Sequence, residues 1–169
     1  IALDKSETVC LVELLRWRED KATKKQYSEL NLQRNTNFMM SLGKKRIIFS
    51  HQRDAMDCGP TCLAMIATYY KQHPDIERIR RNCPSGKNGI SLLGVDRAAK
   101  KIGFDTVAGC LGVKRLVQGS PFPCILHWNQ NHFVVLYKVK KSKTFYIADP
   151  GKGLVKYELE EFKKHWIST

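Results

Sequence analysis

The chain has 169 residues, with 29 Lys and Arg against 16 Asp and Glu, which gives a formal net charge of +13. An apolar fraction of 43% and a charged fraction of 27% are those of an ordinary globular protein, and a chain of this length can bury a core without disulfide staples. The composition therefore excludes a wholly disordered chain and a disulfide-dependent miniprotein, and no apolar run is long enough to predict a membrane span.

The first 45 residues differ from the rest of the chain in their pattern of apolar and polar residues. Ser6 precedes an apolar-rich run over 9–15, and this pattern predicts a helix over about 7–24 that Ser6 caps. The polar and charged stretch that follows indicates an arm or linker, whose function the sequence does not reveal. We therefore divide the chain into an appended, partly helical arm over 1–45 and a folded domain over 46–169.

Helical patterns fill the first half of this domain. After a short predicted strand at 46–49, the apolar run over 58–70 predicts a buried helix with Pro60 in its first turn, where the missing N–H costs nothing. Two more helices are expected over 74–82 and 91–103. Ser91 is the candidate cap of the last helix and Gly103 its candidate stop.

The second half of the domain changes to the period of β-strands. Short β-branched or aromatic runs separated by turn residues predict strands at 104–108, 123–128, 132–139, 144–149 and 153–157, and a helical pattern closes the chain at 160–166. Helices followed by antiparallel strands predict an α+β fold, with the N-terminal helices packed on an antiparallel sheet.

Six cysteines raise the question of disulfides and metal. The absence of a secretory signal and the irregular spacing of the cysteines indicate reduced thiols in a reducing compartment. Cys58 and Cys62 are four residues apart and could share one helix face as metal ligands. A structural zinc site usually draws on a second close pair, which the sequence does not supply, so we predict no metal.

Cys58 lies where a polar loop should turn into the buried helix. The positive end of the helix dipole and unpaired backbone N–H groups would face its sulfur and favour the nucleophilic thiolate. Cys62, one turn later among apolar residues, is typical of a core position. Taken alone, Cys58 could equally be a small apolar residue at a helix start, but its polar approach through Asp57 and Gly59 makes it the candidate nucleophile.

A thiolate nucleophile needs a base and a group that orients the base. His132 begins one predicted strand and Asp149 ends the next. If residues 140–143 form the hairpin loop, paired positions sum to 283, and the side chains of His132 and Asp149 become diagonal neighbours on one face. We predict that a carboxylate there supports the imidazole, and we keep His127 as the alternative base.

Three further residues are candidates because they lie near these positions in the sequence. The side-chain NH₂ of Gln52, six residues before Cys58, could donate to an oxyanion together with the Cys58 backbone N–H. Trp128 and Tyr70 are weaker candidates that could roof a substrate groove.

These residues resemble the bacteriocin-processing, double-glycine-leader cysteine peptidases, which form the N-terminal cytosolic domain of peptidase-containing ABC transporters. The matching segments stand in the family's order and spacing within about 45–169: QRDAMDCGPTC (52–62), GISLLG (89–94), HWNQNHFVVL (127–136) and ADPG (148–151). The resemblance implies a papain-like fold without a cofactor. It assigns the nucleophile to Cys58, the general base to His132, the orienting group to Asp149 and the oxyanion-hole donor to Gln52.

The resemblance also implies a reaction and partners. Family members cut after a Gly–Gly pair in a leader peptide, and the attached transporter, at the cytoplasmic face of a bacterial membrane, exports the freed cargo. The expected partners are a leader-bearing precursor and the transmembrane and nucleotide-binding domains. No Walker-type GxxxxGK[ST] motif occurs, so the chain is either an excised domain or a stand-alone peptidase. The alternative function is a catalytically silent leader-docking module. The presence of Cys58 argues against it.

The charge of +13 suggests nucleic-acid binding as a third function. Residues 1–46 carry 10 basic and 6 acidic side chains, however, and the remainder carries 19 and 10, so the basic residues are spread rather than massed. We interpret the local runs at 44–46, 80–81, 100–101 and 140–143 as solvated faces. An acidic leader helix explains a basic surface equally well, and we expect no nucleic-acid partner.

Overall fold

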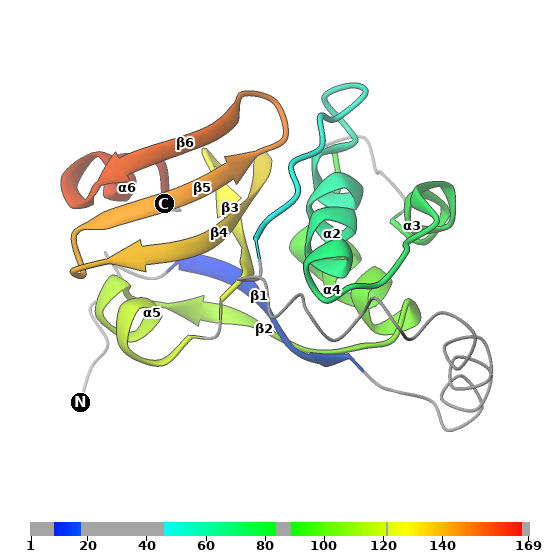
Figure 1. Cartoon of the computed structure of the whole chain (residues 1–169), viewed down its shortest axis with the longest axis horizontal. Coiled ribbons are helices and arrows are strands. Elements are labelled where there is room, and N and C mark those ends of the chain that lie inside the picture. Colours follow the sequence, from blue (N-terminus) through cyan, green and yellow to red (C-terminus); the bar gives the residue numbers. More distant parts are fainter. Residues whose placement is uncertain (1–8, 18–45, 84–88, 121, 167–169) are drawn as a thin grey trace, which may run out of the picture.

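The computed structural model describes residues 9–17, 46–83, 89–120 and 122–166 of the chain. Figure 1 shows α2 (Cys58–Tyr69), α3 (Ile76–Asn82) and α4 (Leu92–Lys101) grouped beside a twisted sheet, with α5 (Val113–Gly119) and α6 (Leu159–Trp166) away from this group. This arrangement confirms the predicted α+β class. Within the described ranges, no helix has the length and apolar character needed to cross a bilayer.

The helices of the first half form where the sequence predicts them. Ser91 caps the last of these helices by accepting a hydrogen bond from the N–H of Gly94, and Gly103 follows its end with a φ of +105°, which favours glycine. The three helices are α2 (Cys58–Tyr69), α3 (Ile76–Asn82) and α4 (Leu92–Lys101).

The second half contains the five predicted strands and the closing helix. One short helix, α5 (Val113–Gly119), was not expected from the sequence. The other elements are β2 (Phe104–Leu111), β3 (Cys124–Trp128), β4 (His132–Lys140), β5 (Thr144–Asp149), β6 (Gly153–Glu158) and α6 (Leu159–Trp166).

The predicted strand at 46–49 is wrong. Residues 46–52 pair with no strand in the described part of the chain, although Ile47 and Phe49 pack on the core while Ile48 is 59% exposed. The alternation of a strand is present without the ladder of hydrogen bonds. This segment leads to the loop at the N-terminal end of α2 (Figure 1).

The predicted helix over 7–24 is also wrong over 9–17, the part of it that the structure describes. Residues Val9–Trp17 form a strand, β1, which lies between β2 and β3 in a sheet ordered β2-β1-β3-β4-β5-β6. All neighbouring pairs are antiparallel. A short, nearly continuous apolar run suits a central strand as well as a helix, so the pattern alone could not separate the two. Residues 9–17 therefore belong to the sheet and not to an appended arm; residues 1–8 and 18–45 of the predicted arm lie outside the described part.

The sheet separates two hydrophobic clusters. One is built with α2, α3 and α4 and contains Cys58, Cys62 and the strand residues Phe133 and Val135. The other contains Leu116 of α5 and the α6 residues, packed on alternate residues of the same strands. Since both faces are covered, residues 133–136 of β4 are apolar and buried, and the polar residues His132 and Asp149 lie at the start of β4 and the end of β5.

Candidate active site

The N-terminal end of α2 presents Cys58 to the sheet. The residue is 3% exposed and belongs to the core cluster between α2 and β4, so it is more buried than its polar flanks predicted. Cys62, one turn later, is fully buried, which confirms the core position expected for it. Cys58, Cys62 and Cys83 carry free thiols.

Gly59 allows α2 to approach α4 closely. A methyl group on Gly59 would lie 3.1 Å from Cγ2 of Val95 and 3.4 Å from Cγ2 of Ile90, both tight contacts. We expect Gly59→Ala to lower the free energy of unfolding by about 1–2 kcal/mol and to slow any reaction at Cys58, because the first helical turn must shift. Urea unfolding measures the first effect. Gly109→Ala is the matched control, since no described atom lies within 4 Å of a methyl group at that position. Equal losses for both variants would contradict this account.

His132 and Asp149 meet where β4 begins and the neighbouring strand β5 ends. Nε2 of His132 lies 2.7 Å from Oδ1 of Asp149, which also accepts a hydrogen bond of 2.9 Å from the N–H of Gly151. Asp149 is 1% exposed. Because Nε2 faces the carboxylate, Nδ1 is the ring nitrogen left for Cys58, which also hydrogen-bonds the imidazole.

The hairpin register explains this contact and differs from the predicted one near the turn. Lys140 pairs with Thr144, so the loop is 141–143 and the register there is one residue off the prediction. An irregularity between Leu136 and Lys138 then restores the predicted pairing, with Val135 opposite Ala148. The prediction that His132 and Asp149 are neighbours is confirmed because a bulge cancels the error at the turn.

The electrostatics of the pair favour a charged imidazole. Burial lowers the pKa of His132, but hydrogen bonds with Asp149 and Cys58 outweigh burial and raise the pKa to about 9. Burial raises the pKa of Asp149, yet the bonds from His132 and Gly151 bring the pKa below its usual value. At neutral pH the arrangement therefore holds an imidazolium between a carboxylate and a thiol, which is the environment that stabilises a thiolate.

Gln52 lies close to the pair of His132 and Asp149. Its backbone N–H donates to the carbonyl of Pro150 at 3.0 Å, which places it beside Asp149. Its Nε2 donates to the carbonyl of Asp54 at 2.9 Å, while its buried Oε1 has no partner among the described residues. A pocket of about 340 Å³ is lined by residues that include Gln52, His132 and Asp149.

The other histidines do not join this group in the described part of the chain. His127, the alternative base, stacks at a tilt on Phe133 with ring centroids 5.2 Å apart, and burial lowers its pKa. His165 bonds to Asn129 through Nδ1. His132 is therefore the histidine that the fold brings to Cys58. No three His, Cys, Asp or Glu side chains cluster as metal ligands within the described residues.

The two aromatic candidates for a groove roof are wrong. Trp128 pairs with His132 across β3 and β4, but its ring is fully buried against Tyr157, Phe162 and His165. Tyr70 follows the C-terminal end of α2, about 18 Å along the helix from Cys58. Nearness in sequence was misleading in both cases, because a helix carries its two ends apart and because α6 covers the Trp128 ring.

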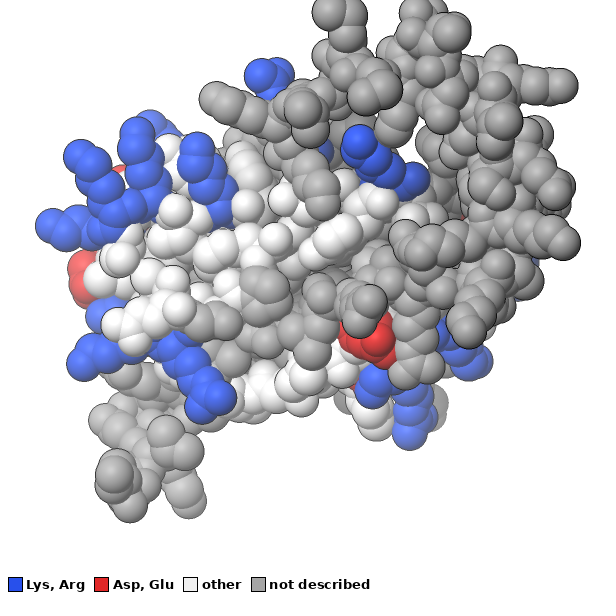
Figure 2. All heavy atoms as spheres, turned by 60° about the horizontal axis from the view of Figure 1, so that its bottom comes forward, with Lys and Arg blue, Asp and Glu red and all other residues white. Residues whose placement is uncertain are grey.

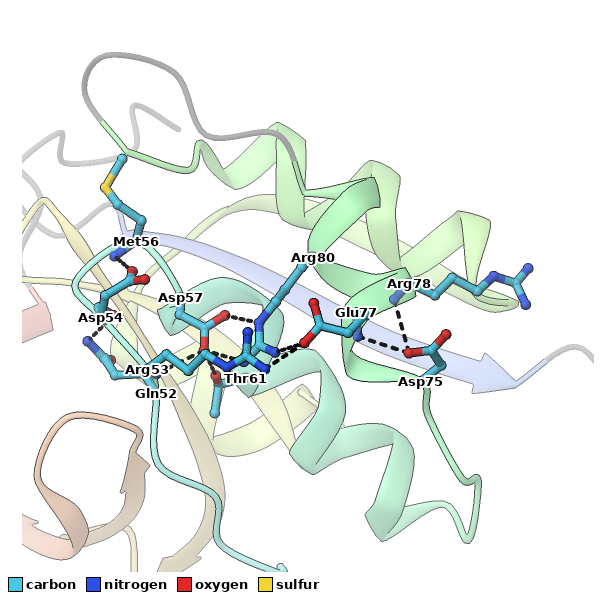
Figure 3. Close-up of polar contacts among 10 residues, drawn as sticks. All are labelled: Gln52, Arg53, Asp54, Met56, Asp57, Thr61, Asp75, Glu77, Arg78 and Arg80. Atoms are coloured by element: carbon cyan, nitrogen blue, oxygen red, sulfur yellow. Dashed lines mark hydrogen bonds and ion pairs between the residues drawn. The ribbon is translucent and has the colours of Figure 1, made fainter.

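Sequence reasoning missed an ion pair directly before Cys58. Asp57 is 5% exposed, and its carboxylate receives Nε and Nη2 of Arg80, each at 2.7 Å (Figure 3). Arg80 was interpreted as part of a solvated run, but its side chain is only 20% exposed, whereas that of Arg81 is 70% exposed. Arg80 also contacts Glu77, which in turn pairs with Arg53. The sequence shows only an acid before the predicted helix; its burial, which requires a cation, is seen in the structure.

The chain is similar to known peptidase domains. A model of the Peptidase C39 family matches residues 46–169. The chain is 36% identical over 130 residues to the lactococcin-G-processing and transport ATP-binding protein LagD of Lactococcus lactis subsp. lactis, covering 74% of this chain and 18% of that protein. It is 31% identical over 139 residues to the colicin V secretion/processing ATP-binding protein CvaB of Escherichia coli, covering 82% and 20%. The chain thus spans about a fifth of the length of these relatives.

Two solved structures share the fold. A double glycine motif protease from an AMS/PCAT transporter, in complex with a leader peptide, superposes with a TM-score of 0.68 at 37% identity and covers 75% of this chain and 89% of its own. The peptidase domain of Streptococcus ComA superposes with a TM-score of 0.65 at 26% identity and covers 72% and 93%. These likenesses confirm the papain-like α+β fold.

Proposed function

The chain belongs to the Peptidase C39 family, and from this premise we propose that it is a cysteine endopeptidase that cuts precursor peptides after a Gly–Gly pair in their leaders. The observation that carries the proposal is the contact of His132 with Asp149 on one side and Cys58 on the other. A nucleophile at a helix start, a base and an orienting carboxylate are the minimum set for acyl transfer through a thioester.

The proposed reaction assigns one role to each of four residues. The Cys58 thiolate attacks the carbonyl carbon of the second glycine, and the resulting oxyanion accepts hydrogen bonds from the Cys58 N–H and from the Gln52 Nε2 hydrogen that Asp54 does not use. The C–N bond then breaks, and the leaving amine takes a proton from the His132 imidazolium, leaving a leader thioester. Water attacks the thioester while His132 takes its proton, which releases the leader and restores the thiolate. Asp149 holds the imidazole in place throughout, and no cofactor is needed.

The proposed partners follow from the relatives. LagD and CvaB are named as processing and ATP-binding proteins for transport or secretion, and the solved AMS/PCAT protease holds a leader peptide. We propose that this domain acts on a leader-bearing precursor and works with the membrane and nucleotide-binding parts of an ABC transporter, at the cytoplasmic face of a bacterial membrane.

Two other functions have less support. A silent docking module would need no base beside the cysteine, whereas His132 and its carboxylate are both in place. A nucleic-acid binder would gather its cations in a stripe. Figure 2 shows Lys and Arg in separate groups around an uncharged area on the described part of one face.

A synthetic precursor with a Gly–Gly leader tests the proposed function. We expect the full chain to release the leader, with mass spectrometry placing the cut after the second glycine. Prior alkylation with iodoacetamide should block the reaction, and a precursor with Val–Val in place of Gly–Gly should stay intact. Tight binding of the Gly–Gly precursor without any cut would establish the docking module instead.

A further inference from the structure

The Asp57 carboxylate occupies an unusual position for the residue that precedes a helix. Asp57 is the N-cap of α2, where an aspartate normally accepts a hydrogen bond from the N–H of the second or third helical residue. Here the side chain makes no capping bond. Because Pro60 lacks an N–H, the donors at this end of α2 belong to Cys58 and Gly59, the groups nearest the reactive sulfur.

Four hydrogen bonds hold the carboxylate away from a capping position. Oδ1 receives Nε of Arg80, and Oδ2 receives Nη2 of Arg80 at 2.7 Å, the N–H of Arg53 at 3.0 Å and the hydroxyl of Thr61 at 3.1 Å. Oδ2 thus accepts three of these bonds and Oδ1 accepts one, and no backbone N–H of α2 is among the donors. Figure 3 shows the carboxylate directed at Arg80, which reaches it from α3.

Arg80 is held in turn by a second acid. Glu77, one turn earlier on α3, receives Nη1 of Arg80 at 2.7 Å and Nη2 of Arg53 at 2.7 Å. The guanidinium thus has a fixed direction, and its planar fork matches both carboxylate oxygens of Asp57. The backbone of Arg53, next to Gln52, is tied to the same carboxylate.

We propose that Arg80 is a positioning residue that draws the Asp57 carboxylate away from the N-terminal end of α2, so that the N–H groups of Cys58 and Gly59 serve the thiolate and the oxyanion. The inference rests on the proposed function, because it assigns a role to a group that acts through Cys58. Without Arg80, the carboxylate would turn to the Gly59 N–H, as a normal cap does, and would bring a negative charge beside the sulfur. Without Asp57, the Arg80 cation would be left near the sulfur with Glu77 alone.

The remaining groups around Cys58 stay constant in such variants. His132 faces the sulfur from β4, with Asp149 of β5 behind it, and Cys62 and Cys83 face it from α2 and the end of α3. Burial raises the pKa of Cys62 well above its usual value and that of Cys83 to about 12. Both thiols therefore stay protonated near neutral pH.

The test is the pH dependence of alkylation by iodoacetamide, followed by mass spectrometry on the peptide that contains Cys58 in the full chain. We expect Arg80→Gln to raise the midpoint by roughly one pH unit and to lower kcat/KM for leader cleavage about tenfold at neutral pH. Asp57→Asn should lower the midpoint, and the double variant should return it close to the wild-type value. Arg81→Gln, with the same charge change on the same helix, is the control that should shift nothing.

Opposite shifts separate positioning from a purely structural role. If Arg80 only stabilised the fold, both single variants would lose activity without opposite changes in the midpoint, and that outcome overturns the proposal. Should Arg80→Gln not fold, as judged by circular dichroism, Asp57→Asn decides alone, and an unchanged or higher midpoint overturns the proposal. A wild-type Cys58 that does not alkylate at neutral pH would refute the proposed function, whereas a reactive Cys58 without these shifts refutes only the role of Arg80.

Discussion

Replacing Cys58 by alanine is expected to abolish cleavage of a Gly–Gly precursor, with kcat/KM lower by on the order of 10⁵–10⁶-fold, as when the nucleophile of a catalytic triad is removed. The neighbouring thiols Cys62 and Cys83 cannot substitute, because both are buried with raised pKa values. Binding of the leader should persist, since the Cys58 residue is only 3% exposed and offers little contact area. Chromatographic assay of cleavage and a titration of leader binding give the two readouts.

Cys110→Ala is the matched control, because it makes the same chemical change at an exposed position of β2. It should cut at the wild-type rate. Equal cleavage by Cys58→Ala and the wild type would mean that another group is the nucleophile and would remove the basis of the proposed mechanism.

Replacing Asp149 by asparagine is expected to lower kcat/KM by roughly 10²–10⁴-fold and to move the alkaline limb of the pH profile. The hydrogen bond and charge of Asp149 help to raise the pKa of His132 to about 9, so the imidazolium survives in the wild type until the pH approaches that value. The asparagine removes the charge, the pKa of His132 falls, and the proton is lost at lower pH. The alkaline limb of kcat/KM should therefore move to lower pH.

Rates measured from pH 5 to pH 10 show this shift. Glu160→Gln removes one negative charge from an exposed site on α6 and should leave both the rate and the limb unchanged. If the limb of Asp149→Asn stays at the wild-type pH, the carboxylate does not govern the protonation of His132, and its role is confined to holding the ring.

The sequence predicted which side chains lie together at the candidate site better than it predicted the secondary structure around them. Cys58, His132 and Asp149 could be found because each stands at the end of a strongly patterned element, where a polar residue is conspicuous. The predicted strand register that makes His132 and Asp149 neighbours is correct at the site, but for a reason that the sequence does not show. The loop is one residue shorter than expected, and the irregularity near Tyr137 compensates for it.

The misses share a physical cause, which is that local pattern does not record distant partners. Residues 9–17 are apolar enough for a helix, and only β2 and β3, which follow much later in the chain, make them a strand. Arg80 and Arg81 are equivalent in sequence, yet Arg80 pairs with the buried Asp57, whereas Arg81 lies at the surface and pairs with the exposed Asp75. Trp128 is an aromatic residue of the kind that can line a groove, but α6 packs against it and buries it in the core.

The place of β1 in the sheet also bears on the order of folding. β1 is made first, but its partners β2 and β3 are made long after it, and closing such a large loop costs entropy that no local contact offsets. The hairpins from β3 to β6 need only short loops and can form early. We therefore expect β1 to pair with β2 and β3 last. Until then, the apolar strand β1 remains unpaired on the nascent chain.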